Sequence, residues 1–263
     1  MLTKEVGDMA ELVRVTQDGP VCEIALNRPD RLNAINDEMV LQLHRALDGI
    51  GSARALLLWG EGRAFSAGRD LSEMKLGEED AARVLRETLH PLFLRIYTLP
   101  IPTFAAVQGA CLGAGLGLAF SCDVVIAAED AMFASPFARI GAVLDSGGHF
   151  HFVRSLGRQR AMDLIYSGRR LTGKEAEAMG LVSRAVPADQ LLPTARQLAQ
   201  AAARGPTLAF RLSKRIAQAA MVADFPTVLD LEAEAQGIVA RSYDFQEGVR
   251  SFLEKREPSF RGE

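Results

Sequence analysis

Hydrophobic positions in the first third of the chain alternate between strand-like and helix-like spacing. Val21 to Leu26 (VCEIAL) has the alternation expected of a half-buried strand, and Ala55 to Leu58 is a continuous apolar run typical of a strand covered on both faces. Between them, Asn36 is placed to cap a helix that continues through Leu47. This order of strand, helix and strand predicts βα units.

The middle of the chain continues the alternation and adds two glycine-rich loops. Glu78 to Tyr97 predicts a helix that ends at LPIP, and the predicted strands are Thr103 to Val107 and Asp123 to Ala127. The first loop, GRAFSAGRDL at 62–71, follows the strand at 55–58, and the second loop, GACLGAGLG at 109–117, follows the strand at 103–107. Strands that alternate with helices in this way predict the α/β class.

After about Arg160 the pattern becomes helical. Thr172 is a suitable N-cap for TGKEAEAMGL, and a polar tail ends in EGVRSFLEKREPSF. Three longer helical segments lie between them: Leu191 to Ala203, Pro206 to Ala220 and Thr227 to Ala240. We therefore expect an α/β body over residues 1–200 and a helical C-terminal region over residues 201–263.

Composition narrows the class of protein. The chain has 263 residues, 48% hydrophobic and 24% charged, which is enough to bury a core. A net charge of -3 gives no overall basic field, so we expect no nucleic-acid partner. The longest apolar stretch, Cys111 to Ala128, is broken by glycines and an aspartate and is a poor membrane span. The N-terminal segment has no basic and apolar signal pattern, so a cytoplasmic protein without a membrane partner is expected.

The cysteines and histidines favour neither a disulfide framework nor a metal centre. Cys22, Cys111 and Cys122 are odd in number and lie among apolar residues, which predicts buried free thiols. No CxxC or HExxH spacing occurs, and the pair His149 and His151 lacks nearby cysteine or clustered carboxylate ligands. We therefore expect no metal site.

Both glycine-rich loops lie between a buried strand and a helix. Small residues let the backbone approach a ligand closely, and a helix N-terminus offers free N–H groups that favour negative charge. Two such loops that converge would form a site for a developing oxyanion. Either loop alone is better explained by tight packing of strand on helix. The GAGLG run lacks a full GxGxxG pattern and its acidic partner, so it does not indicate a dinucleotide site.

Four motifs in order resemble the crotonase family, also called the enoyl-CoA hydratase/isomerase family. They are NRPDRLNAIN, GRAFSAGRDLSEM, QGACLGAGLGLAFSCDVVIA and GLVSRAVP, and the resemblance runs from about Val13 to the tail FLEKREPSF. It implies a spiral core of ββα turns with a C-terminal helical trimerisation region. It also implies an acyl-CoA substrate, a homotrimer or dimer of trimers, and no cofactor beyond the coenzyme A of the substrate.

The same resemblance implies roles for single residues. The two backbone N–H groups of the oxyanion hole correspond to Arg69 and to Ala114, where glycine is more usual in the family. The positions that correspond to CoA contacts are Arg31, Ala67, Phe252 and Lys255, the last two reaching CoA from a neighbouring subunit. Hydratases of the family hold and move a water molecule with two glutamates, and those positions are Gly117 and Phe137 here. Neither residue can move a proton, so efficient hydration is not expected.

Asp145, in RIGAVLDSGGHF, matches an acid found in dienoyl-CoA isomerases and most resembles the acid of PaaG-type isomerases. Those enzymes convert a ring-epoxide thioester to an oxepin, or shift the double bond of a 3-enoyl-CoA. A single carboxylate can take the Cα proton of a polarised thioester and return it at Cγ. Apolar neighbours such as Leu144 should raise the pKa of this carboxyl. Isomerisation with Asp145 as acid and base is therefore expected.

Other interpretations stay open. Asp145 before HFHFVRSL is also an ordinary helix N-cap, and a resemblance to chlorobenzoyl-CoA dehalogenase would make it a nucleophile. The latter is less favoured because Phe137 stands at the tryptophan position of that enzyme. A hydratase with other acids and a CoA-binding relative without turnover are further alternatives. His149 and His151 either tune the acid or only cap and pack, and Asp70 is expected at a solvated helix start.

Overall fold

The protein, seen in a computed structural model, is described over residues 10–75 and 77–263. The described residues form a six-stranded sheet in the order β1-β2-β3-β4-β6-β9, in which the β1–β2 pair is antiparallel and the others are parallel. Its strands are β1 (Val13–Asp18), β2 (Val21–Leu26), β3 (Ala55–Gly60), β4 (Thr103–Val107), β6 (Val124–Ala128) and β9 (Arg184–Val186). A small second sheet contains β5 (Ala110–Leu112), β7 (Met132–Ala134) and β8 (Leu171–Thr172).

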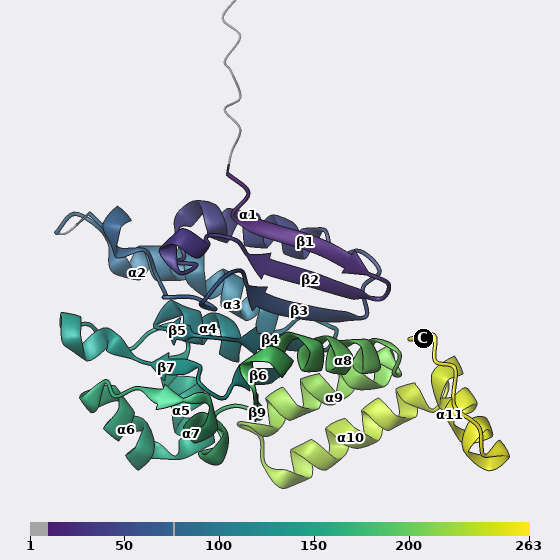
Figure 1. Ribbon diagram of the computed structural model, residues 1–263. Coiled ribbons are helices and arrows are strands. Elements are labelled where there is room, and N and C mark those ends of the chain that lie inside the picture. The colour runs from purple at the N-terminus through teal and green to yellow at the C-terminus, as the bar shows by residue number, and fades with distance from the viewer. Residues whose placement is uncertain (1–9, 76) are drawn as a thin grey trace, which may run out of the picture.

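Helices surround the sheets and dominate the C-terminal region (Figure 1). Those before the middle of the chain are α1 (Asp37–Asp48), α2 (Ala81–Val84), α3 (His90–Tyr97) and α4 (Ala114–Phe120). Those after it are α5 (Gly148–Leu156), α6 (Arg158–Ser167), α7 (Gly173–Ala178), α8 (Leu191–Ala203), α9 (Thr207–Ala220), α10 (Phe225–Val239) and α11 (Tyr243–Glu254). Short 3-10 turns cover Pro29–Arg31, Leu71–Glu73, Pro136–Ile140 and Ala188–Gln190.

The α/β prediction is confirmed, and several elements have the predicted bounds. β4 and α8 begin and end where expected, Asn36 caps α1 through Met39 N, and Thr172 forms a capping box with Glu175. Such agreement is strongest where periodicity and a capping side chain act within a few residues. The three cysteines are free and buried, as expected.

Strand β2 is not half-buried, because all six of its residues are buried. Helix α8 packs against β2, β3 and β4, so the face that the sequence assigned to solvent is covered. Glu23 on that face forms an ion pair with Arg196 of α8, with 2.8 Å between the Arg196 Nε and Glu23 Oε1 atoms. The charged residue in the alternation is therefore a buried glutamate paired with a partly exposed arginine, and it does not mark a solvated face.

Two other predictions need correction. The predicted helix at 78–97 begins later, at Ala81, and is interrupted by a π-helical turn over Leu85–Leu89 before α3. The expected polar tail contains the helix α11, whose buried residues are Asp244, Glu247 and Ser251. Asp244 accepts hydrogen bonds from the backbone amides of Arg261 and Gly262, so a polar face of α11 packs against the end of the chain. Its inward polar residues hid the helical periodicity.

No helix in the described part of the chain is long and apolar enough to cross a membrane. Residues 1–9, which include the start of the segment that lacks a signal pattern, lie outside the described residues.

Candidate active site

The two glycine-rich loops lie side by side, as a shared site requires. The amide of Ser66 in the first loop donates to Ala110 O of the second, and Leu112 N donates back to Ser66 O, both at 3.0 Å. A Cβ atom on Gly68, which has φ +91°, would lie 2.6 Å from Leu112 O and 3.3 Å from Ala114 N. Glycine at this position therefore allows the loops to approach this closely.

Among the residues that the structure describes, the two amides assigned to the oxyanion hole have no backbone hydrogen-bond acceptor. Gly68 O and the amide of Asp70 are both bonded to Ile35, so the amide of Arg69 between them faces the other way. Ala114 is the first residue of α4, where no preceding helical carbonyl is available. Across residues 10–75 and 77–263, neither amide donates to another backbone carbonyl. The arrangement leaves two neighbouring donors for a ligand oxygen.

The NRPDRLNAIN turn is hydrogen-bonded to the first loop. Asn33 is buried in a left-handed conformation, and its side-chain amide donates to Ala64 O at 2.8 Å. Ser66 Oγ donates to Asn33 O and accepts from Gly68 N. Ala67 N donates to Leu32 O, which places Ala67 beside the turn that carries the exposed Arg31. These two predicted CoA positions therefore belong to one surface.

Asp70 is not at a solvated helix start. It caps the 3-10 turn at Leu71–Glu73, but its carboxylate is also buried and lies 2.6 Å from the guanidinium of Arg28. Hydrogen bonds from Ser72 and Arg28 lower the pKa of Asp70 to about 2. Asp70 is therefore engaged within the loop and does not serve as a base.

Asp145 lies half-buried beside this pair of loops. Burial raises the pKa of its carboxyl, against the opposite effects of the Ser146 hydroxyl, His90 and Arg69. Asp145 is not the N-cap of α5, because Gly147 occupies that position. The direction of this pKa shift agrees with the prediction and suits a group that must take up a proton.

The guanidinium of Arg69 is fixed in one orientation by an ion pair with Glu79. Its two terminal nitrogens donate to the two carboxylate oxygens of Glu79, each at 2.7 Å. This bidentate pair fixes a positive charge near Asp145 while partly neutralising it. The backbone amide of Arg69 is thus a candidate oxyanion donor, and its side chain supplies a positive charge near Asp145.

Gly117 and Phe137 occupy the positions of the two hydratase glutamates, and neither residue carries a carboxylate into the site. A Cβ atom on Gly117 would lie 2.6 Å from the Cβ of Ser146, and closer still to the Ser146 carbonyl oxygen. The Phe137 ring lies 3.7 Å from the point where a Cβ on Gly113 would be, so it covers the second loop. Neither position leaves a carboxylate to hold water.

A cavity of about 310 Å³ lies between α3 and α5 and is lined by Ser146 and Gly147, the two residues that follow Asp145. Its walls include His90, Tyr97, Ser146, Phe150 and His151. His90 was not predicted as a site residue; it follows the π-helical turn and lies near enough to Asp145 for its charge to lower the pKa of that carboxyl. π-Helical turns often occur at functional sites, but no sequence motif predicted this turn.

The two histidines of the HxH pair differ in environment. His149 is exposed, while the His151 ring packs near Phe120 and Phe150. Burial lowers the pKa of His151 to about 4, so it is neutral at pH 7. Within the described residues, no group of three or more His, Cys, Asp or Glu side chains is arranged to hold a metal ion.

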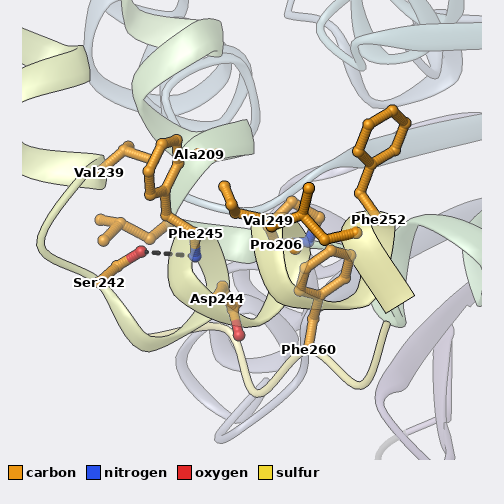
Figure 2. Close-up of a pocket in the computed structure, with 12 residues that line it drawn as sticks. Pro206, Ala209, Val239, Ser242, Asp244, Phe245, Val249, Phe252 and Phe260 are labelled. Carbon is orange, nitrogen blue, oxygen red and sulfur yellow. Dashed lines mark hydrogen bonds between the residues drawn. The ribbon is translucent and has the colours of Figure 1, made fainter. Parts of the chain in front are cut away.

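A larger apolar pocket, about 460 Å³, lies in the C-terminal region. Figure 2 shows Phe245, Val249, Phe252 and Phe260 around it. Phe252 is 82% exposed, and Lys255 follows α11 in a left-handed conformation. Figure 1 places α11 at the opposite end of the molecule from α5 and β5. One chain therefore does not bring Phe252 and Lys255 to Ala67.

Comparison with known proteins identifies the family of the chain. Residues 16–263 match the sequence model of the family described as enoyl-CoA hydratase/isomerase. A Rhodobacter capsulatus protein named "Probable enoyl-CoA hydratase" is 43% identical over 91% of this chain and 93% of its own. The 1,2-epoxyphenylacetyl-CoA isomerase of Escherichia coli is 38% identical over 97% of this chain and 100% of its own.

Solved structures give the same result. An enoyl-CoA hydratase from Bacillus anthracis aligns with a TM-score of 0.91 and 32% identity over 96% of this chain and 100% of its own. The sheet order, the helical C-terminal region and the paired loops thus form the crotonase fold. The chain belongs to the enoyl-CoA hydratase/isomerase family.

Proposed function

We propose that this protein is an enoyl-CoA isomerase in which Asp145 is the acid and base. The observation that carries the proposal is the half-buried carboxyl of Asp145, with its raised pKa and close enough to Arg69 for the charge of that residue to act on it. Among the described residues, the amides of Arg69 and Ala114 in the paired loops have no backbone acceptor. The closed space at Gly117 supports it further, because no water-holding carboxylate stands there. The family supplies the acyl-CoA class of substrate.

The reaction follows from these groups. The amides of Arg69 and Ala114 bind the thioester oxygen, which acidifies the Cα–H of a 3-enoyl-CoA. Asp145 takes that proton, the electrons move into a dienolate, and the same carboxyl returns the proton at Cγ. The double bond thereby moves from position 3 to position 2 with no net change in atoms. Each amide would contribute about 3 kcal/mol of transition-state stabilisation.

A ring substrate is a variant of the same proposal. The Escherichia coli relative named 1,2-epoxyphenylacetyl-CoA isomerase is similar over the whole chain, and the cavity wall beside Asp145 contains Tyr97 and Phe150. Ring isomerisation of an epoxyphenylacetyl-CoA type of thioester would use the same polarised carbonyl. Direct assay of both substrate types separates the two.

We further propose that the active assembly is a homotrimer or a dimer of trimers. Phe252 lies on α11 and Lys255 follows it, whereas Ala67 follows Ser66, which pairs with Cys111 of β5. Because α11 and β5 lie at opposite ends of one chain, contact of Phe252 and Lys255 with CoA requires a second copy. The exposed apolar side chains of α11, including Leu253, are suited to such a contact. Sedimentation of the protein at assay concentrations tests the assembly.

The test of the reaction uses 3-hexenoyl-CoA and follows the absorbance of the conjugated 2-enoyl thioester. Parent enzyme should produce it, and Asp145→Asn should lower kcat by about 10²- to 10⁴-fold. Circular dichroism and CoA-ester binding confirm that the variant is folded. Unimpaired turnover by Asp145→Asn would overturn the assignment of the base.

Hydration is the second candidate, because the Rhodobacter capsulatus relative carries a hydratase name. Crotonyl-CoA would then lose its conjugated absorbance in the presence of the enzyme. Rapid loss would mean that other acids replace the two glutamates. Turnover of either substrate excludes a CoA-binding protein without activity.

A further inference from the structure

Ser146 has an unusual backbone conformation for its residue type. Its φ is +55°, in the left-handed region that favours glycine, although glycine follows it at position 147. The residue is only 2% exposed and lies on the wall of the cavity beside Asp145. A non-glycine residue in this region costs free energy, and such residues gather at functional sites.

The Ser146 hydroxyl is aimed at the carboxylate next to it. Ser146 Oγ donates to Asp145 Oδ1 at 2.6 Å, a short distance typical of a hydrogen bond to a charged oxygen. Within the described residues, Oδ2 of Asp145 has no hydrogen-bond donor. The bond therefore holds one oxygen and leaves the other available for a proton.

Gly117 on α4 keeps Ser146 in place. The absence of a side chain at Gly117 lets the backbone and Cβ of Ser146 pack directly on the helix. Because α4 also begins at Ala114, the same helix supports one amide of the oxyanion hole. The turn at Asp145 and the second loop are thus tied to one rigid element.

We propose that Ser146 is a positioning residue that orients the Asp145 carboxylate and sets the pH range in which it acts as a base. This inference rests on the proposed role of Asp145. Ser146 acts through its hydroxyl. Its left-handed backbone and its contact with Gly117 keep that hydroxyl directed at Asp145 Oδ1. No contact of Ser146 with the reacting atoms is required.

The charges that face Asp145 from other elements are few. His90 at the start of α3 and Arg69 in the first loop both lower the pKa of Asp145 through their charges, and the charge of Arg69 is partly neutralised by Glu79. His151 on α5 is neutral at pH 7 because burial lowers its pKa to about 4. The Ser146 bond favours the charged carboxylate and is the largest of the effects that oppose burial.

Two substitutions separate the hydroxyl from the backbone. Ser146→Ala and Ser146→Gly both remove the hydrogen bond, but glycine accepts φ +55° without strain and alanine does not. Loss of a hydrogen bond to a charged group should raise the pKa of Asp145 further. The acid limb of the kcat/KM profile should therefore move to higher pH in both variants.

Ser121→Ala is the matched control. Ser121 is a buried serine on the wall of the same cavity, but its hydroxyl donates to Gly117 O and not to Asp145. In Ser121→Ala the Gly117 carbonyl still accepts a hydrogen bond from the backbone amide of residue 121, so the control leaves this carbonyl paired. Its acid limb should stay at the parent position.

The pKa of the Asp145 carboxyl can also be measured directly, without an activity assay. Carbon-13 NMR of protein labelled at the aspartate Cγ, with Asp145→Asn to assign the signal, should show the same upward shift in both Ser146 variants. An unmoved titration in both overturns the inference, and a shift in Ser146→Ala alone reduces the residue to a backbone role. If Ser146→Ala fails to fold, Ser146→Gly still decides.

The two proposals fail in different ways. Full activity of Asp145→Asn overturns the proposed reaction, and the inference that rests on it falls with it. An inactive Asp145→Asn together with parent-like pH profiles and titrations in both Ser146 variants overturns this inference alone.

Discussion

The amide of Ala114 lies 3.3 Å from the point where a Cβ atom on Gly68 would be. Gly68 immediately precedes Arg69, so the space at this glycine determines how closely the two proposed oxyanion donors approach. The position also has φ +91°, which alanine rarely adopts. Loop spacing at Gly68 is therefore a direct test of the oxyanion hole.

Gly68→Ala should push the loops apart and lower kcat/KM by about 10²- to 10³-fold, the loss typical of one oxyanion donor. Arg69→Ala is the matched control, because it keeps the backbone amide and removes only the side chain paired with Glu79. We expect a smaller loss for Arg69→Ala, measured with the same 3-enoyl-CoA. Equal losses in two folded variants would show that the side chain, and not the loop spacing, matters.

Gly117→Glu should not restore hydration. The new side chain would meet the backbone of Ser146, so the Asp145 turn must shift before any carboxylate can reach the site. Overpacking of this kind costs about 1–3 kcal/mol, and the smaller Gly117→Ala should already lower the free energy of unfolding. Crotonyl-CoA assays and urea denaturation measure the two effects.

Gly237→Ala serves as the comparison for that experiment. Gly237 lies within α10 with no atom within 4 Å of an added Cβ, so alanine should be neutral or stabilise by about 0.5–1 kcal/mol. Rapid crotonyl-CoA hydration by Gly117→Glu would contradict the prediction that this position is closed.

Asp145→Asn should raise the stability of the protein at neutral pH. Burial raises the pKa of Asp145 above its ordinary value of 3.8, so the folded state holds this proton more tightly than the unfolded state does. The free energy of unfolding therefore falls as pH rises through the window above 3.8, and the deficit persists at pH 7. The asparagine variant lacks this deficit.

Urea denaturation of parent and Asp145→Asn at pH 7 and at pH 3.5 checks the sign. The variant's advantage should be present at pH 7 and shrink toward pH 3.5, where the carboxyl is mostly protonated in both states of the parent. An advantage that grows on acidification would mean that the folded state lowers the pKa of Asp145.

Lys255→Asn should weaken binding of the nucleotide part of CoA. Asparagine tolerates the left-handed conformation of Lys255, so the substitution removes a charge with little backbone strain. An exposed ion pair contributes about 0.2–1 kcal/mol, so KM for an acyl-CoA should rise by about 1.4- to 5-fold with kcat little changed. An acyl-pantetheine, which lacks the nucleotide, should show no difference between variant and parent.

Much of the architecture could be predicted from short stretches of sequence. The strand at 103–107 and the helix at 191–203 follow from hydrophobic periodicity, and Asn36 and Thr172 act as caps on amides three residues away. The motifs around Gly68 and Ala114 indicated the family and the place of the paired loops. Such features depend on contacts within a few residues, so the amino-acid order alone carries them.

The relations that shape the candidate site were decided by the tertiary structure. Ser146 closes the space at Gly117, the charge of His90 after a π-helical turn acts on Asp145, and Glu79 holds Arg69. The helix α11 was mistaken for a polar tail because its inward acids bind the end of the chain. Each relation joins residues that meet only when separate elements pack together, so the sequence determined which residues are present and packing determined what they face.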